Sequence, residues 1–269
     1  MDFTKKELKL INYMQVLADD GLAVAFSGGV DSTLILRLAI GEEKNSLQKN
    51  IVAFTFNTML NPKKDMEIAK KICDDYNVRQ VVINVNRVEN PKIKSNDHKR
   101  CYYCKYELFS KIAKLKSNCN LKHIVDGSNF DDTKVYRPGR QASKELGVIS
   151  PLEDCGFTKD EVRTLAKKLD ISVAQRPSAP CMLTRFPYDT DVDFALFPKI
   201  EHLENEIRTL GFYNVRIRVH GQIARIEVDK EDIVKLAEKL PDFSNEFKQT
   251  GFKYVTIDMD GFRSGSMDE

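Results

Sequence analysis

A glycine-rich hexapeptide near the N-terminus has the residue types needed to hold a phosphate. It spans Ser27–Ser32 (SGGVDS) and lies between the apolar run 22–26 and an apolar helical stretch, 33–40. Backbone N–H groups at a helix start favour an anion, and glycines let the backbone approach one closely. The two serine hydroxyls can donate to phosphate oxygens, and the Asp31 carboxylate can hold Mg²⁺. The loop contains no lysine, so it is not a Walker A loop, but its context predicts nucleotide binding.

A second group with chemical potential is a close pair of cysteines. Cys101 and Cys104 form the only CxxC among six cysteines, which we expect to stay reduced. This spacing lets two thiolates reach one metal from a helix start, and Cys181 can supply a third. Three thiolates with an open fourth position suit a 4Fe–4S cluster. A redox pair or a coincidental surface pair are the alternatives.

Two arginines alternate along a predicted strand near the C-terminus. Arg216 and Arg218 therefore point to one face of that strand. Two guanidinium forks on one face suit a phosphate group, although a solvated strand face would show the same alternation. Glu204, on the preceding helix, either faces this site or is structural.

The elements that position these groups fall into two parts. Up to residue 175, strands and helices alternate, which predicts a parallel sheet covered by helices on both faces. A capping box formed by Thr158 and Glu161 starts the last helix of this part. The strands are predicted at 22–26, 51–56, 79–85 and 123–126, and the helices at 4–19, 33–40, 65–76, 103–116 and 159–169.

The second part begins after a proline-rich loop, 176–187, that carries Cys181. We expect an α/β fold with two domains, 1–180 for the nucleotide and 181–269 as a small α/β domain for substrate binding or oligomerisation. The predicted elements of the second domain are helices at 197–210 and 230–240 and strands at 215–219, 223–228 and 253–258.

Charge and hydropathy limit the classes of partner. The chain of 269 residues has 42 basic and 40 acidic side chains, a net charge of +2, which argues against nucleic-acid binding through bulk positive charge. It has no apolar run of about 18 residues, so no membrane span is expected. The first residues lack the apolar core of a signal peptide. We therefore expect a cytoplasmic protein.

The hexapeptide SGGVDS resembles the signature of the PP-loop ATP pyrophosphatases, and a longer series of motifs resembles the LarE family. The resemblance runs from about residue 20 to the C-terminus. Its further motifs are Asp126–Asn129, Asp131-Asp132, Tyr136–Arg140, Lys144–Gly147, Ser150–Leu152, Arg176-Pro177, Cys181, Arg185–Tyr188, Arg216–Gly221, Ala224–Glu227 and Gly261–Ser266.

The resemblance implies an ATP-dependent sulfur transferase. Such an enzyme cleaves ATP to AMP and pyrophosphate, adenylates a carboxylate of pyridinium-3,5-biscarboxylic acid mononucleotide, and converts it to a thiocarboxylate for a nickel-pincer cofactor. The implied partners are this small molecule and a sulfur source, in a homo-oligomer without nucleic acid or membrane. The implied residues are Ser27, Gly28, Gly29, Val30, Asp31, Ser32, Gly127 and Asn129 for ATP and Mg²⁺, with Asp31 and Cys181 catalytic, and Arg185, Arg216 and Arg218 for substrate.

Cys181 occupies the position of the family's sulfur-donating cysteine. Arg176 and Arg185 flank it and are expected to lower its thiol pKa. The resemblance is to the three-cysteine type, in which Cys101, Cys104 and Cys181 hold a 4Fe–4S cluster. The alternative is a single turnover in which Cys181 gives up its own sulfur.

Three positions depart from the family pattern. Pro180 replaces an alanine, Thr184 replaces a serine and keeps the hydroxyl, and Asp189 replaces a glycine, which puts a local turn in doubt. Two other functions compete with the main prediction. One is a tRNA thiolation enzyme of the same superfamily, and the other is a nucleotide-sensing module without chemistry.

Overall fold

The computed structural model describes residues 2–41, 49–85, 90–178, 180–263 and 265–268. The chain divides into two compact units. The first contains Met1–Thr58, Lys63–Asn86 and Lys99–Ser178, and the second contains Met59–Pro62, Arg87–His98 and Ala179–Glu269. Two short excursions of the N-terminal half thus belong to the second unit, an arrangement that no single cut in the sequence describes.

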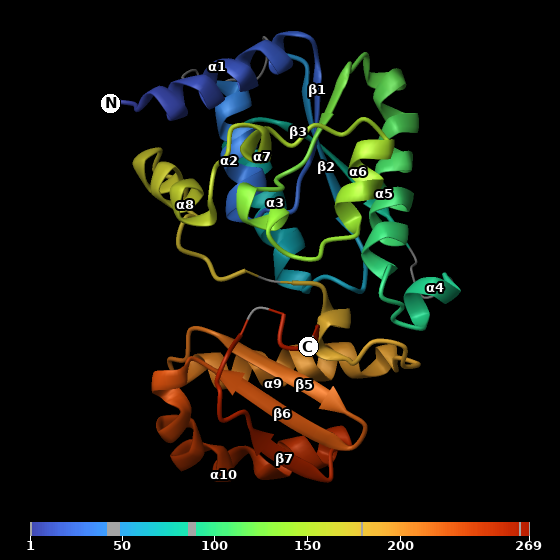
Figure 1. Ribbon diagram of the computed structural model, residues 1–269, viewed down its shortest axis with the longest axis vertical. Helices are drawn as coiled ribbons and strands as arrows, with labels where there is room; N and C mark the ends of the chain where they lie inside the picture. The colour runs from blue at the N-terminus through green and yellow to red at the C-terminus, as the bar shows by residue number, and fades with distance from the viewer. Residues whose placement is uncertain (1, 42–48, 86–89, 179, 264, 269) are drawn as a thin grey trace. The chain divides into compact units, whose positions relative to one another are not determined.

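The first unit contains a four-stranded parallel sheet in the order β3-β2-β1-β4 (Figure 1). Leu22 of β1 is in register with Ile51 of β2 and with His123 of β4. This confirms the predicted parallel sheet. The strands are β1 (Leu22–Ala25), β2 (Ile51–Asn57), β3 (Arg79–Asn84) and β4 (His123–Val125).

Helices cover both faces of this sheet, as the sequence predicts. Alternate residues of β1 belong to different apolar clusters: Leu22 and Val24 to one, Ala23 to the other. The first cluster includes residues of α1, α2 and α8, and the second includes residues of α5. The helices of this unit are α1 (Lys5–Asp19), α2 (Val30–Ile40), α3 (Lys63–Asp75), α5 (Arg100–Lys116), α6 (Gly139–Glu145), α7 (Pro151–Asp154) and α8 (Lys159–Lys168).

The second unit is built around a three-stranded mixed sheet in the order β5-β6-β7. Strands β5 and β6 are antiparallel, and β7 runs parallel to β6. The strands are β5 (Val215–His220), β6 (Ile223–Val228) and β7 (Tyr254–Ile257), and the helices are α4 (Pro91–Lys94), α9 (Phe197–Thr209) and α10 (Ile233–Thr250).

One predicted helix of this unit was too short. A helix was expected at 230–240, and the residue that follows it is Pro241, a residue type disfavoured in a helix interior. Instead, a 3₁₀ turn at Lys230–Asp232 leads into α10, which continues through Pro241 to Thr250. Leu236 and Phe247, one on each side of the proline, are both fully buried. Their packing outweighs the local cost of the proline.

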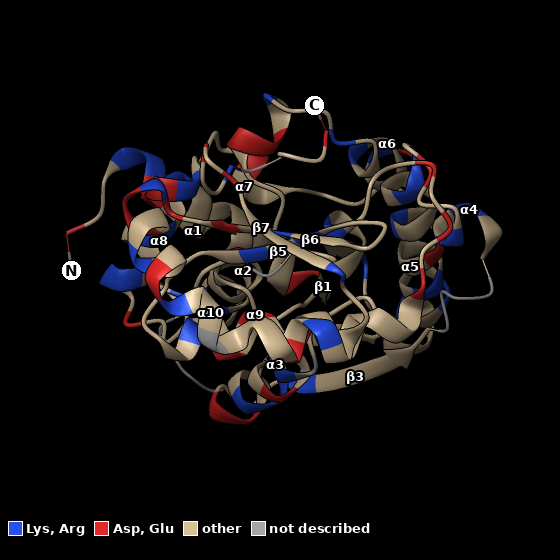
Figure 2. Ribbon diagram, turned by 90° about the horizontal axis from the view of Figure 1, so that it is seen from below, with Lys and Arg blue, Asp and Glu red and all other residues tan. Residues whose placement is uncertain are grey.

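The surface charges follow the near-neutral composition. Basic and acidic residues are interspersed on the helices, α5 and α8 among them (Figure 2). Within the residues described, no helix has the length and apolar character that a membrane span requires.

Candidate active site

The Ser27–Ser32 loop connects the end of β1 to the start of α2. Gly28 has a φ of +72°, a conformation that glycine adopts without strain. A Cβ at this residue would lie 3.0 Å from the backbone nitrogen of Ala69 in α3. The hydroxyl of Ser32 donates to the Gly29 carbonyl at 3.2 Å and accepts from the Ser27 N–H at 3.3 Å. The loop is therefore held in shape by its own side chains, at the N-terminus of a long helix.

A second loop, which follows β4, packs directly on the first. A Cβ at Gly127 would lie 2.9 Å from the Ser32 nitrogen and 3.0 Å from the Asp31 Cβ, so only glycine fits there without displacement. The Asn129 side chain donates to Asp31 Oδ1 at 3.2 Å. The structure thus brings Gly127 and Asn129, two predicted site residues, onto the predicted nucleotide loop.

The Asp31 carboxylate lies in the first turn of α2 with a side chain that is 20% exposed. Asn129 donates to one oxygen, and the ammonium group of Lys159 is ion-paired with the other. The carboxylate is partly accessible and lies beside a loop at a helix start that has no side-chain cap. It therefore fits a Mg²⁺ ligand, because the ion can replace the Asn129 and Lys159 donors. Sequence reasoning did not find Lys159, since it lies 128 residues along the chain.

Asp126 is a further buried carboxylate that sequence reasoning did not assign. Burial opposes its ionisation, but Lys105 and hydrogen bonds from Ser150 and Ser128 lower its pKa below the usual value. Lys105 lies 3.1 Å away and Ser150 Oγ 2.7 Å away. Because Asp126 directly precedes Gly127, this network fixes the backbone at the start of the loop that follows β4.

The CxxC pair lies in the first turn of α5, where the sequence predicts it. Cys101 is exposed and Cys104 is half-buried, and none of the six cysteines forms a disulfide. Their spacing of three puts both thiols on the same side of the helix. Among the described residues, no group of three or more His, Cys, Asp or Glu side chains forms a metal site. Cys101 and Cys104 belong to the first unit and Cys181 to the second.

In the second unit, the Cys181 loop is fastened by two buried ion pairs. Arg185 is 2% exposed and donates to Glu204 at 3.0 and 2.9 Å, while its third nitrogen donates to the Pro180 carbonyl at 3.0 Å. Arg218 donates to Glu227 at 2.9 and 2.7 Å and to the Thr184 carbonyl at 2.8 Å. These arginines, both predicted to bind substrate, have their charges matched by buried carboxylates.

The pKa of Glu204 shows how strongly this arrangement favours its charged form. Burial raises the pKa, but the charge and hydrogen bonds of Arg185, with help from Arg216 and Arg208, lower it to about 2. Its Oε1 also accepts from the Ile217 N–H at 3.1 Å, which ties α9 to β5. The sequence left open whether Glu204 faces the substrate site or is structural. Its contacts give it a structural role.

This shift predicts an acid-sensitive fold. The contribution of Glu204 is complete above its ordinary pKa of 4.5 and is lost as the pH falls toward about 2. That difference is worth roughly 3 kcal/mol. We expect urea unfolding to show a free energy that falls between pH 5 and pH 2, with a flatter slope in Glu204→Gln. Equal slopes in both proteins would contradict this contribution.

Arg216, the third predicted substrate ligand, has a different environment. It is 2% exposed, donates to the Val215 carbonyl at 2.7 Å, and lies 5.3 Å from the centre of the Phe262 ring. Burial and the nearby charge of Arg185 lower its pKa to about 10, against the opposing effect of Glu204. A crowded, buried cation of this kind is stabilised by an anion.

Two further contacts involve the Cys181 loop and its expected neighbours. Arg176, which was expected to flank this thiol, is ion-paired with Asp65, and both residues belong to the first unit. Burial raises the pKa of Asp65, and Arg176 opposes that shift. The Cys181 carbonyl accepts from the Thr184 N–H at 3.0 Å and from its hydroxyl at 2.8 Å. Thr184 differs from the serine of the family pattern but keeps its hydroxyl, and this hydroxyl shapes the loop.

The turn at Asp189 is preserved although the family has glycine there. Asp189 has a φ of +54°, in the left-handed region that glycine prefers and aspartate tolerates. The completely buried Asn96, from the excursion 87–98, donates to the Pro187 carbonyl at 2.6 Å and to that of Phe186 at 3.1 Å. Sequence reasoning gave no signal for Asn96.

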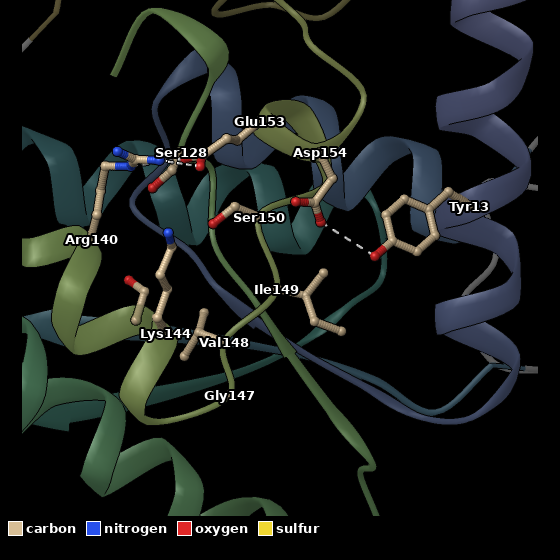
Figure 3. A pocket seen from close by; sticks show the side chains of 11 residues that line it. Tyr13, Ser128, Arg140, Lys144, Gly147, Val148, Ile149, Ser150, Glu153 and Asp154 are labelled. Atoms are coloured by element: carbon tan, nitrogen blue, oxygen red, sulfur yellow. Dashed lines mark hydrogen bonds and ion pairs between the residues drawn. The ribbon is translucent and has the colours of Figure 1, made fainter. Parts of the chain in front are cut away.

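The first unit also contains a cavity of about 360 Å³ (Figure 3). Two pairs of its lining side chains interact: Arg140 is ion-paired with Glu153, and the Tyr13 hydroxyl donates to Asp154 at 3.4 Å. The lining residues are Tyr13, Ser128, Arg140, Ser143, Lys144, Gly147, Val148, Ile149, Ser150, Glu153 and Asp154. None of the predicted site residues is among them.

The parallel sheet, together with the SGGVDS loop between β1 and α2, defines a PP-loop nucleotide-binding domain, and the PP-loop domain family matches residues 2–134. The chain is 31% identical over 248 residues to the pyridinium-3,5-bisthiocarboxylic acid mononucleotide synthase of Lactiplantibacillus plantarum, covering 92% of this chain and 89% of that protein. It belongs to the LarE family.

The chain is also similar to two other proteins. An uncharacterized protein of Synechocystis is 33% identical over 264 residues, which is 97% of both chains. The structure of NMN synthetase from Francisella tularensis aligns with a TM-score of 0.52 at 18% identity, covering 76% of this chain and 87% of that one. The second likeness concerns the fold.

Proposed function

We propose that this protein is an ATP-dependent sulfur transferase that converts a carboxylate of pyridinium-3,5-biscarboxylic acid mononucleotide to a thiocarboxylate. The observation that carries the proposal is the preformed PP loop with Asp31 at its helix start, on a chain similar along 92% of its length to a synthase of the bisthiocarboxylic product. The product would serve a nickel-pincer cofactor.

Adenylation is assigned to the first unit. The triphosphate of ATP would lie on the N–H groups and hydroxyls of Ser27–Ser32, and Asp31 would hold the Mg²⁺ that neutralises it. Gly127 packs on the Ser27–Ser32 loop beside Asp31, and Asn129 donates to the Asp31 carboxylate. A carboxylate oxygen of the substrate attacks the α-phosphorus, pyrophosphate leaves, and an acyl-adenylate forms. A sulfur nucleophile then attacks the carbonyl carbon, and AMP leaves.

Substrate recognition is assigned to the second unit. Arg216 binds the phosphate of the mononucleotide, since it is the arginine whose burial and like-charged neighbours lower its pKa most clearly. Arg185 and Arg218 support this site by holding the Cys181 loop through the carbonyls of Pro180 and Thr184.

Arg216→Ala should therefore weaken binding of the phosphorylated substrate and leave ATP binding unchanged. Each lost charge-assisted hydrogen bond costs roughly 1.5–3 kcal/mol, so affinity should fall by at least about tenfold. Calorimetric titration with each ligand measures this. Arg225→Ala is the matched control, because Arg225 lies on the neighbouring strand and is ion-paired with Asp258. If ATP affinity fell instead, Arg216 would belong to the nucleotide site.

Sulfur delivery is assigned to Cys181 with Cys101 and Cys104. The CxxC at the start of α5 and the half-buried Cys181 are thiols outside any disulfide, and three thiolates are a donor set that fits a 4Fe–4S cluster. Such a cluster, held by these three thiolates, would supply an exchangeable sulfide to the reaction. Because the pair and Cys181 belong to different units, the proposal requires that the units bring them together.

The function is tested by anaerobic incubation of the protein with ATP, Mg²⁺, sulfide and the biscarboxylic mononucleotide. We expect AMP and pyrophosphate in equal amounts, and a product whose mass corresponds to exchange of oxygen for sulfur. Pyrophosphate release that requires tRNA instead, with tRNA affinity that falls steeply with salt, would favour the tRNA thiolation enzyme. Absence of pyrophosphate release despite ATP binding would favour a nucleotide-sensing module.

A further inference from the structure

A short turn that follows β7, residues 265–268, packs on the sheet of the second unit. The Ser266 hydroxyl donates to Glu227 Oε1 of β6 at 2.5 Å. Ser266 is 8% exposed, and Glu227 is completely buried. A hydroxyl that donates to a buried carboxylate forms a charge-assisted hydrogen bond, which is stronger than one between neutral groups. The turn is therefore firmly fastened to β6 at Ser266.

Through Glu227, this turn is connected to the Cys181 loop. The other oxygen of Glu227, Oε2, accepts from Nε and Nη2 of Arg218 at 2.9 and 2.7 Å. Nη1 of the same arginine donates to the Thr184 carbonyl at 2.8 Å, and the Thr184 hydroxyl donates to the Cys181 carbonyl at 2.8 Å. An unbroken series of hydrogen bonds, all within the second unit, therefore leads from Ser266 to the backbone of Cys181.

The Ser266 hydroxyl also decides which arginine the Glu227 carboxylate faces. Arg225 Nη2 lies 3.4 Å from Oε1, the oxygen that accepts from Ser266, and Arg225 is itself ion-paired with Asp258. At 3.4 Å this contact is weaker than the 2.5 Å hydrogen bond from the serine. Without the hydroxyl, we expect the carboxylate to turn toward Arg225 and its hydrogen bonds with Arg218 to lengthen.

The turn has two further anchors besides Ser266. The Asp268 N–H donates to the Gly265 carbonyl at 2.7 Å, which closes the turn. Asp268 Oδ1 accepts from the hydroxyl of Tyr188, the residue that follows the Cys181 loop, at 2.5 Å. The backbone that carries Ser266 is therefore kept in place when its hydroxyl is removed, so a substitution there tests the hydroxyl alone.

We propose that Ser266 is a positioning residue for sulfur transfer, which holds the Cys181 loop in shape through Glu227 and Arg218. The inference rests on the role of Cys181 in the proposed function. It assigns Ser266 to the sulfur-transfer step and not to adenylation, because the PP loop belongs to the first unit. Formation of the thiocarboxylate should therefore depend on the hydroxyl, whereas formation of AMP should not.

The test compares Ser266→Ala, which removes the hydroxyl, with Ser266→Thr, which keeps it. Ser244→Ala is the matched control, because Ser244 is a half-buried serine of α10 in the same unit. The first measurement is the yield of thiocarboxylate per AMP during anaerobic turnover with ATP, Mg²⁺, sulfide and the biscarboxylic mononucleotide. The second is the rate at which iodoacetamide alkylates Cys181 in iron-free protein without substrate, assigned by peptide mapping. Thermal unfolding shows that each variant is folded.

We expect Ser266→Ala to form at least about tenfold less thiocarboxylate per AMP, and its Cys181 to be alkylated at least about tenfold faster, because a charge-assisted hydrogen bond is lost. The KM for the mononucleotide should stay unchanged, since Arg216 keeps its contact with the Val215 carbonyl. Ser266→Thr and Ser244→Ala should match the unchanged protein in both measurements.

The inference is overturned if folded Ser266→Ala matches the unchanged protein in either measurement, or if Ser266→Thr is impaired as severely as Ser266→Ala. The alkylation rate does not depend on any activity of the protein. If the unchanged protein forms no thiocarboxylate, the proposed function fails, and the alkylation rates alone decide whether Ser266 holds the Cys181 loop.

Discussion

Replacing Asp31 by asparagine is expected to reduce AMP formation by at least about a hundredfold while the fold persists. The substitution keeps the shape of the side chain and its hydrogen bond with Asn129, but removes the negative charge that is proposed to hold Mg²⁺. Without the metal, the developing charge on the α-phosphate and the leaving pyrophosphate is less well stabilised. A quenched-flow or end-point assay of AMP measures the effect directly.

The matched control for this prediction is Asp160→Asn. Asp160 is an exposed carboxylate next to Lys159, so the control removes one negative charge from α8 without touching the loop. Its AMP yield should equal that of the unchanged protein. Circular dichroism and unfolding temperature show whether Asp31→Asn is folded. A normal AMP yield in folded Asp31→Asn would remove Asp31 from the catalytic site.

The nucleotide loop could be predicted from the sequence because its determinants are local. An apolar strand, two glycines and a helix start lie within a short stretch, and Gly28 has the left-handed backbone that this pattern implies. The alternation of strands and helices likewise predicts a parallel sheet covered on both faces. The structure agrees, because alternate residues of β1 belong to two separate apolar clusters.

The partners of the site residues could not be predicted in this way, because they come from remote parts of the chain. Lys159 meets Asp31 across 128 residues, and Lys105 meets Asp126 across 21. No periodicity links such residues. The alternation of Arg216 and Arg218 predicts a shared face, but not that Glu227 neutralises Arg218.

Packing also overrode two local signals in the second unit. The helix expected to end at residue 240 continues through Pro241 as part of α10, because buried residues on both sides hold it. Aspartate at position 189 cast doubt on a turn, yet it occupies the left-handed conformation usual for glycine. In both cases a modest local cost is offset by contacts that only the folded chain contains.

The source of the transferred sulfur gives the prediction whose alternative outcomes differ most: repeated turnover with added sulfide, or a single turnover that consumes Cys181. If Cys101, Cys104 and Cys181 hold a cluster as proposed, protein isolated anaerobically contains iron and sulfide in equal amounts. It then turns over repeatedly when sulfide is supplied, and Cys181 keeps its sulfur. Cys101→Ala and Cys104→Ala should each abolish product formation while adenylation continues, because the substituted residues lie outside the PP loop.

Cys119→Ala is the matched control for these substitutions. Cys119 is also a free, half-buried cysteine of the first unit, at the end of the 3₁₀ turn that follows α5. Its removal should change neither the iron content nor the number of turnovers. Loss of activity in all three variants alike would point to a general effect of substitution in this region rather than to ligation.

The competing mechanism predicts the reverse of each observation. If Cys181 donates its own sulfur, each chain completes a single turnover, added sulfide does not extend the reaction, and the protein becomes lighter by the mass of H₂S. Intact mass spectrometry after anaerobic turnover detects this loss, and peptide mapping assigns it to Cys181. Such a loss, with full single-turnover activity in Cys101→Ala and Cys104→Ala, would overturn the cluster and leave the ATP-dependent adenylation of the carboxylate intact, because that step uses the Ser27–Ser32 loop and not the thiols.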